Sequence, residues 1–531
     1  MNLFTPWTPS IGLALVALAL QHGGRRLAPW ARNALAGAGV AGAVGLVVAL
    51  RFGADSAPVG FPWPASLGHS PSLAADPEMF PFAGLIVLIL AGAVAADAAA
   101  WARWPRALAL AAASLLSIYA ENLPALAGAW VALEVLLVAQ EPGVSTDTDD
   151  RRLGKVSAFW GVLGWVAIAW LWRATQGASL RPYETPQWTA ATRTILLAVG
   201  LIRMGVFPLV SRRLAHGLSG LATADAVGLA PAIAGLAIAQ RAAALGAPSY
   251  PDVALWIGAI GAAACGLSAW VNANPRHRVA WALGTPLGLG LMMWAEGVAP
   301  AQVIFAATAA AMALGFGLWT VRQPFAGVPT PRRRHALAAA VSLAPIAVVG
   351  MGPLSPATVP ALGLWQALLN QSRLVALAQA LAGQMLAMAA LLHPGVAPAS
   401  PRRRTRAGVF AIWGITALAL ALGPRALLML AGTAPAWSTP SLSPGAWAAL
   451  LLPLLGAMAL PELQELGDTW REYGARASRF LSLAWLRAGL SEFGNALAAA
   501  ARGLEALTLG ETYAIWVLAL LLGLVLMLGL P

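Results

Sequence analysis

Long apolar runs recur along the whole chain, and they limit its possible folds more than any other feature. A helix that crosses a bilayer needs about 20 predominantly apolar residues, because the hydrocarbon core is about 30 Å thick. Hydrophobic residues make up 59% of this chain and charged residues only 10%, whereas soluble domains are about 25% charged. The sequence therefore predicts an all-α protein that crosses a membrane many times.

The apolar runs predict about 14 to 16 transmembrane helices. The expected spans are residues 10–21, 34–50, 82–101, 108–119, 123–139, 156–171, 195–210, 220–240, 253–271, 279–294, 301–321, 336–351 (continued after a break by 362–369), 374–392, 408–422, 447–460 and 512–530. The first span is short for a full crossing. The segment before it lacks basic residues, so we expect a retained span and not a cleaved signal peptide.

Basic residues gather in every second loop between the predicted spans. The basic loops are residues 25–32, 103–106, 151–155, 212–213, 276–278, 332–335 and 402–406. Because positively charged loops remain on the cytoplasmic side, this pattern predicts an inner-membrane protein with its N-terminus outside. It also explains the net charge of +12 without nucleic-acid binding. Arg173, Arg181 and Arg193 fit poorly, since they fall in outer loops.

Two charged residues lie inside apolar spans. Glu134 belongs to the run LPALAGAWVALEVLLVAQ, and Arg203 belongs to IRMGVFPLV, which Pro208 interrupts. A charge at the centre of a bilayer costs about 2.5–3.5 kcal/mol by insertion scales, so such residues usually pair and mark ion pathways. We therefore expect Glu134 and Arg203 to face each other. A purely structural ion pair, or a snorkelling Arg203, is the alternative.

Other polar residues are weaker candidates for a proton path. Asp97 lies near the inner end of its span, where a coupling role and a simple polar contact are equally compatible with the sequence. His216 and Asp225 lie near a helix entrance and could form a proton inlet, although loop or capping roles explain them as well.

Nothing in the sequence predicts a cofactor, metal ion or catalytic centre in this chain. Its single cysteine, Cys265, excludes an internal disulfide and a cysteine-ligated iron–sulfur cluster within the chain. No His, Cys or carboxylate residues have the spacing of a metal site, and no glycine-rich phosphate loop is present. Any energy for transport must therefore come from a partner.

Residues 462–507 differ from the predicted spans. Charges alternate there with Leu, Phe and Trp at helical spacing, which is typical of an amphipathic helix lying along a membrane surface. The loop pattern places this helix on the cytoplasmic side, and the last span then anchors its far end.

Several segments, in order, resemble the antiporter-like membrane subunits of respiratory complex I and the Mrp sodium/proton antiporters. WVALE, which ends at Glu134, is similar to the acid-bearing helix of that family. RMGVFPLVSRRLAHGLSGLATADAV (203–227) looks like its broken seventh helix and the following loop. RHRVAW (276–281) and MGPLSPATVPALGLWQALL (351–369) resemble a later helix entry and a second broken helix.

The resemblance implies two inverted five-helix repeats, each containing a broken helix. It places Glu134 on the proton path, Arg203 at the position of a family Lys, and the helix breaks at Pro208, Pro353 and Pro356. The lateral helix followed by one span is similar to the most distal subunit of complex I. The implied divisions are 1–107 (N-terminal transmembrane helices), 108–393 (antiporter-like core), 394–460 (C-terminal transmembrane helices), 461–510 (lateral helix) and 511–531 (final anchor).

The chain also departs from the family pattern. Where the family usually has a second Lys, in the eighth span, this chain has Ala234 and Gly235. Its second broken helix has no ionisable residue, and Gln366 is the nearest polar side chain. Arg203 stays charged at any working pH, so it cannot relay a proton as a Lys can, although it can hold Glu134 ionised.

These features predict a membrane subunit of a multisubunit complex that moves protons or monovalent cations. The expected partners are other membrane subunits and a soluble energy-converting subunit, belonging to a complex I-like quinone oxidoreductase, a membrane-bound hydrogenase or an inorganic-carbon uptake system. A degenerate scaffold that conducts nothing is the alternative, and the missing bases favour it. A stand-alone secondary transporter is less favoured, because the lateral helix indicates neighbours.

Overall fold

The computed structural model describes residues 5–53, 58–60, 70–96, 104–138, 148–177, 179–181, 188–204, 229–246, 248, 250–272, 278, 281–298, 358–392, 443–460, 492 and 517–523. The helices of this part of the chain are α1 (Thr8–Gly23), α2 (Pro29–Gly53), η2 (Pro77–Met79), α3 (Phe80–Ala96), α4 (Trp104–Tyr119), α5 (Leu123–Val138), α6 (Thr148–Thr175), α7 (Ala190–Met204), α9 (Ala230–Ala244), α10 (Pro251–Val271), α12 (Thr285–Ala295), α15 (Thr358–Asn370), α16 (Leu374–Leu392) and α19 (Pro444–Ala459). The predicted spans 301–321, 336–351 and 408–422 lie outside the described residues, as does the lateral helix except for Glu492.

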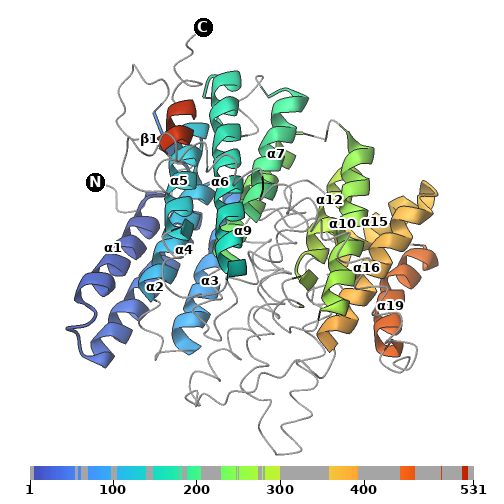
Figure 1. The fold of residues 1–531 in the computed structure, drawn as a ribbon, viewed down its shortest axis with the longest axis horizontal. Coiled ribbons are helices and arrows are strands. Elements are labelled where there is room, and N and C mark those ends of the chain that lie inside the picture. Colours follow the sequence, from blue (N-terminus) through green and yellow to red (C-terminus); the bar gives the residue numbers. More distant parts are fainter. Residues whose placement is uncertain are drawn as a thin grey trace, which may run out of the picture.

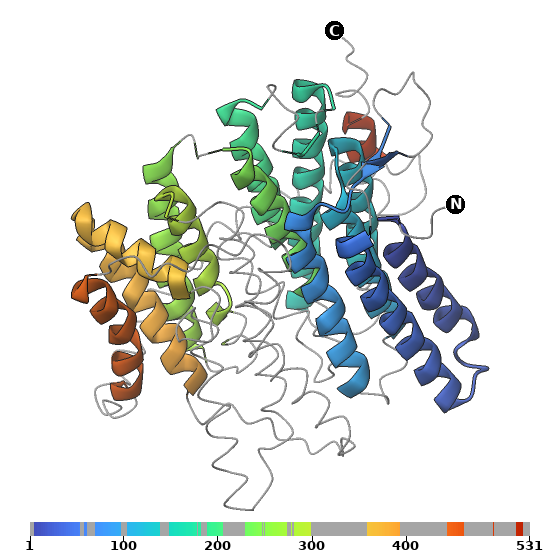
Figure 2. The ribbon, with the colours of Figure 1, turned by 180° about the vertical axis from the view of Figure 1, so that it is seen from behind.

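The described helices pack in two groups. Helices α1 to α9 form the first group, and α10, α12, α15, α16 and α19 form the second. Both views show α1 and α2 at one edge of the molecule and α16 and α19 at the opposite edge (Figures 1 and 2). The first group contains both predicted charged residues of the site, so it is the group that positions them.

Several of the described helices have the length and apolarity of membrane spans. Four are long and apolar enough to cross a bilayer, namely Pro29–Phe52, Pro77–Val94, Pro251–Val271 and Leu374–Leu391. The outward face of α10 shows why a bilayer is needed, because Val253, Trp256, Ile257 and Ile260 are each between 41% and 54% exposed. Such a continuous apolar face is rare on a soluble monomer and is suited to contact with lipid. The polytopic all-α fold predicted from the sequence is therefore confirmed.

Proline residues define where several helices begin. The missing N–H of proline costs nothing in the first turn, and its fixed φ suits the helix. Among the described helices, a proline stands at the first or second position of α1, α2, α3, α4, α5, α9, α10, α12 and α19. At α19, Ser443 also caps the helix, because its side chain accepts the N–H of Ala446 at 3.3 Å. These local signals give the spans sharp starts inside an otherwise uniform apolar sequence.

Close backbone approach between small residues joins the helices. A Cβ added at Gly235 of α9 would lie 2.7 Å from the carbonyl oxygen of Gly200 of α7. A Cβ at Gly288 of α12 would lie 2.5 Å from the carbonyl oxygen of Gly258 of α10. Small residues permit such tight packing in membranes, where association depends on van der Waals contact and not on hydrophobic exclusion.

A short antiparallel strand pair, which the sequence did not predict, covers one end of the first group. Strand β1 (Val59–Gly60) pairs with β2 (Ser72–Leu73). An isolated bridge joins Leu73 to Ala120, at the turn between α4 and α5. The charge pattern predicts that this end of the bundle faces outward, and we call it the Glu121 end.

Candidate functional site

Glu134 lies in the interior of the first group of helices. It belongs to α5, whose other residues are almost all apolar, and its exposed fraction is 0%. Its neighbour on the chain, Leu133, is equally buried. An ionised carboxylate in such surroundings is stable only when it is paired and hydrogen-bonded.

Arg203 provides a partner for this carboxylate. It lies in the last turn of α7 and is 2% exposed. Its Nη1 donates to Oε1 of Glu134 at 2.6 Å. The short distance is typical of a charge-assisted hydrogen bond. The facing arrangement predicted from the sequence is therefore present, with α5 and α7 each contributing one charge.

Trp130 is a third member of the site, and sequence reasoning missed it. The centroid of its ring lies 3.6 Å from Cζ of Arg203, so the guanidinium stacks on the indole. Its backbone carbonyl accepts a hydrogen bond from Nη2 of Arg203 at 3.2 Å. The available signal was the spacing, because Trp130 precedes Glu134 by four residues in WVALE and such residues share one helix face.

Two glycines of α6 make room for the site. A Cβ at Gly161 would collide with the carboxylate of Glu134, and a Cβ at Gly164 would collide with the ring of Trp130. The carbonyl of Gly161 also accepts the indole N–H of Trp130 at 2.8 Å. Glycines three residues apart therefore give α6 a flat face on which both side chains rest. The sequence carried this spacing, but glycines in an apolar run have many other uses.

The structure explains why no base stands at the expected position in α9. Ala234 and Gly235, which stand where the family usually has a second Lys, are buried against α7. The close contact of Gly235 with Gly200, described above, leaves no space for a long side chain. The space that a Lys side chain would need is therefore filled by the backbone and side chains of α7.

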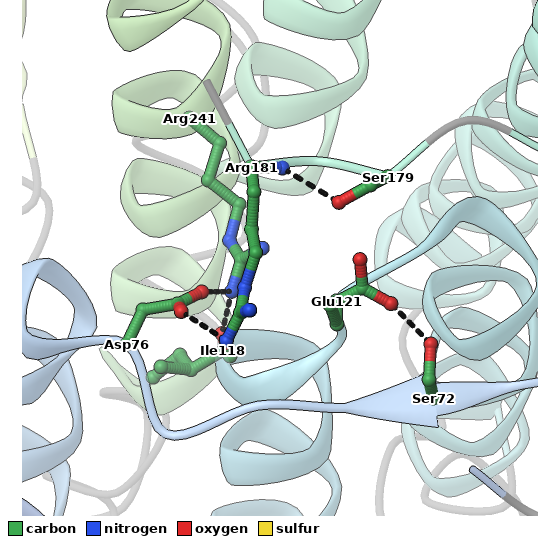
Figure 3. A network of polar contacts seen from close by, with 7 residues as sticks. All are labelled: Ser72, Asp76, Ile118, Glu121, Ser179, Arg181 and Arg241. Carbon is green, nitrogen blue, oxygen red and sulfur yellow. Dashed lines mark hydrogen bonds and ion pairs between the residues drawn. The ribbon is translucent and has the colours of Figure 1, made fainter. Parts of the chain in front are cut away.

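A second polar network lies at the Glu121 end. Figure 3 shows Arg181 and Arg241 side by side, both directed at Asp76. The Asp76 carboxylate lies 2.8 Å from Arg181 and 3.4 Å from Arg241. Arg241 also donates to the carbonyl of Ile118, near the end of α4, at 2.9 Å. We call Asp76, Arg181 and Arg241 the outer clasp. These three residues join the segment before α3 to α9 and to the segment after α6, and Arg241 also joins α9 to α4.

The outer clasp explains a misfit in the charge pattern. Arg181 lies in a predicted outer loop, where the positive-inside rule disfavours it, but it is held by an ion pair. Arg193, another misfit, donates to the carbonyl of Leu245 at 2.8 Å. These two arginines therefore stabilise helix ends and do not report on membrane orientation.

Glu121 belongs to the same end of the bundle and is 5% exposed. The hydroxyl of Ser72 donates to its carboxylate, and its backbone N–H donates to the carbonyl of Ser72 at 2.9 Å. Asn122 accepts the N–H of Ser72 at 3.2 Å and the N–H of Ala125 at 3.1 Å. These bonds join strand β2 to the corner between α4 and α5.

We expect Asp76→Asn to lower the midpoint of thermal unfolding in detergent, because it removes the shared counter-charge of two arginines. Breaking a buried ion pair costs about 3–5 kcal/mol, and we expect about 2 kcal/mol here, since the Asp76 side chain is 20% exposed. Asp252→Asn is the matched control. Asp252 also pairs with an arginine, Arg373 at 2.9 Å, but its side chain is 72% exposed, so the loss should stay below about 1 kcal/mol. Equal shifts for the two variants would contradict a structural clasp.

The second group has an ion-pair cluster of its own. Arg373, between α15 and α16, contacts Asp252 and lies 3.1 Å from Glu296. Gln371 donates to Glu296 at 2.7 Å. Gln366, the polar residue expected in the second broken helix, accepts the N–H of Ser443 at 2.9 Å and so joins α15 to α19. These contacts hold helix ends together.

The remaining predicted site residues lie outside the described residues. These are Asp97, His216 and Asp225, together with the helix breaks at Pro208, Pro353 and Pro356. The helix after the second predicted break, α15, begins at Thr358. Within the described part of the chain, no group of three or more His, Cys, Asp or Glu residues could hold a metal ion.

Comparison with known proteins gives matches of structure only. No protein-family model and no curated protein sequence matches the chain. A chain of the Mrp complex from Dietzia sp. DQ12-45-1b is 18% identical over 98% of this chain and 62% of that chain, with a TM-score of 0.71. The present chain thus spans less than two thirds of the length of that relative.

Two respiratory complexes contain similar chains. One is in respiratory complex I from Thermus thermophilus with bound NADH, at 16% identity over 86% of this chain and 100% of that chain, with a TM-score of 0.61. The other is in the membrane-bound sulfane sulfur reductase, an archaeal respiratory membrane complex, at 14% identity over 99% of each chain, with a TM-score of 0.66. The chain therefore has the fold of the antiporter-like membrane subunits of the complex I and Mrp family.

Proposed function

We propose that this protein is a membrane subunit of a multisubunit complex and moves protons, or another monovalent cation, through the Glu134–Arg203 site. The observation that carries the proposal is the ion pair itself, at 2.6 Å and with both side chains at most 1% exposed. An ionisable pair at membrane depth is expensive and is typically kept for ion transfer. The three chains of similar fold described above come from multisubunit membrane complexes.

The two charges have different roles in this proposal. Glu134 takes up and releases the proton, because a carboxylate can change its charge. Arg203 stays protonated at any working pH and provides a fixed positive charge beside the Glu134 carboxylate. The chain supplies the path, and a partner subunit supplies the energy. The soluble energy-converting subunit, the inner-membrane location and the outside N-terminus are parts of the same proposal.

A non-conducting scaffold is the second candidate. It is favoured by the tight contact of α7 with α9, where the usual second base would lie. A scaffold would keep the ion pair for stability alone. The two candidates differ in one measurable property, which is whether proton flux through the assembled complex depends on Glu134.

The test is reconstitution of the whole purified complex in sealed vesicles containing a pH-sensitive dye. Driving the complex with its own electron donor or ion gradient should acidify or alkalise the lumen, and an uncoupler should abolish the signal. Vesicles that contain the complete, active complex but show no dependence on Glu134 would favour the scaffold.

We expect deletion of residues 462–507 to release partner subunits while the helical bundle stays inserted in the membrane. The reason is the two-faced pattern of this segment, which suits a helix that lies across neighbouring subunits. The measurement is quantitative mass spectrometry of the subunits that copurify with the tagged chain. A deletion that leaves the subunit list unchanged would rule out bracing by this segment.

A further inference from the structure

We propose that Trp130 is a positioning residue of the proton site, which holds the guanidinium of Arg203 in place both when Glu134 is ionised and when it carries a proton. This inference rests on the proposed function. It adds a neutral residue to a site that otherwise consists of two charges.

Trp130 is itself buried and held against α6. Its indole N–H donates to the carbonyl of Gly161, its ring lies against Gly164, and its side chain is 1% exposed. Such a side chain cannot change rotamer without displacing α6. It therefore offers Arg203 a surface that does not move during transport.

Trp130 contacts the guanidinium in two ways that do not involve Glu134. The ring face lies 3.6 Å from Cζ, and the backbone carbonyl accepts Nη2 at 3.2 Å. Nη1 is the nitrogen that reaches Glu134. Two contacts of the guanidinium are thus with residues of α5, and one of these residues, Glu134, loses its charge when a proton arrives.

Protonation of Glu134 removes a negative charge from beside a buried arginine. Loss of a counter-charge is costly for a buried charge, and a contact that keeps its strength holds the arginine in the same position. Cation–π attraction is strongest when the cation is desolvated, and it no longer competes with a carboxylate once Glu134 is neutral. Trp130 therefore stabilises the protonated intermediate and returns Arg203 to the same position for the next cycle.

The test replaces Trp130 by site-specific incorporation of tryptophans with an increasing number of ring fluorines. Fluorine withdraws electron density from the ring face while the size of the side chain and its N–H donor are nearly unchanged. We expect proton flux per assembled complex to fall stepwise with each fluorine, reaching about tenfold below wild type at the most fluorinated residue. A packing role alone would not produce this graded loss.

Trp104 provides the matched control, because it is also 1% exposed and lies in the same group of helices, at the start of α4. The same fluorinated series at Trp104 should leave flux unchanged. Unchanged flux across the Trp130 series, in complexes where Glu134→Gln abolishes flux, would overturn the role of Trp130 and leave the proposed function intact. Normal flux in Glu134→Gln would overturn both, so the two failures are distinguishable.

Discussion

Glu134→Gln is expected to abolish proton flux while the complex still assembles. The amide has the shape of the carboxylate, and its oxygen can still accept Nη1 of Arg203, but it cannot take up a proton at any working pH. General acid–base groups contribute typically 10²–10⁴-fold to proton-transfer rates. A loss of at least about 100-fold is therefore expected if Glu134 is an obligatory carrier.

The measurement is dye-reported flux in vesicles that contain the whole complex, normalised to the amount of assembled complex. Glu296→Gln is the matched control, because Glu296 is also nearly buried, with a 3% exposed side chain, and also contacts an arginine at 3.1 Å. It belongs to the helix-end cluster of the second group, so its variant should transport normally. Normal transport by Glu134→Gln would instead favour the scaffold, with the protons crossing elsewhere in the complex.

The fold was largely predictable from the sequence, because lipid imposes a simple rule on composition. The apolar runs predicted nearly all the described helices, but some of these helices extend beyond the predicted residues. Residues 156–171 were expected as one span, whereas α6 runs from Thr148 to Thr175. Hydropathy measures the part of a helix that lies in hydrocarbon, while backbone hydrogen bonding continues into the polar interface. Strands β1 and β2 have two residues each, which is too short for any periodic signal.

The site was predictable only where it carries charge inside an apolar run. Glu134 and Arg203 could be paired from the sequence because the cost of isolating either one is large. Trp130, Gly161 and Gly164 could not, since an aromatic residue and two glycines are ordinary in a transmembrane helix. Their role depends on three helices meeting at one point, which no single-helix pattern encodes.

The outer clasp was missed for a different reason. Arg181 was treated as evidence about membrane orientation, and the sequence gives no sign that it meets Asp76, which lies more than 100 residues earlier in the chain. Loop arginines serve both topology and local structure, and composition alone does not separate these uses. A loop charge that contradicts an otherwise regular pattern is therefore a reason to look for a buried acid near the same membrane surface.

Arg203→Ala is expected to have the largest effect on stability and to remove most of the flux as well. Removing the guanidinium leaves Glu134 buried without this counter-charge and opens a cavity beside the Trp130 ring. Breaking a buried pair in this way typically costs about 3–5 kcal/mol. We therefore expect poor assembly, a lowered midpoint of thermal unfolding in detergent, and flux near background in the fraction that does assemble.

Arg203→Lys separates charge from shape at the same position. A lysine keeps the positive charge and can still make a cation–π contact with Trp130, but it lacks the planar fork that donates to both Trp130 and Glu134. It also restores the residue expected from the family resemblance, so we expect assembly and flux to be retained or increased. Thermal unfolding in detergent and vesicle flux, measured on Arg203→Lys and Arg203→Ala, separate the effect of the positive charge from that of the guanidinium shape. If Arg203→Lys lost flux as completely as Arg203→Ala, the guanidinium geometry, and not a fixed positive charge, would be what the proton site requires.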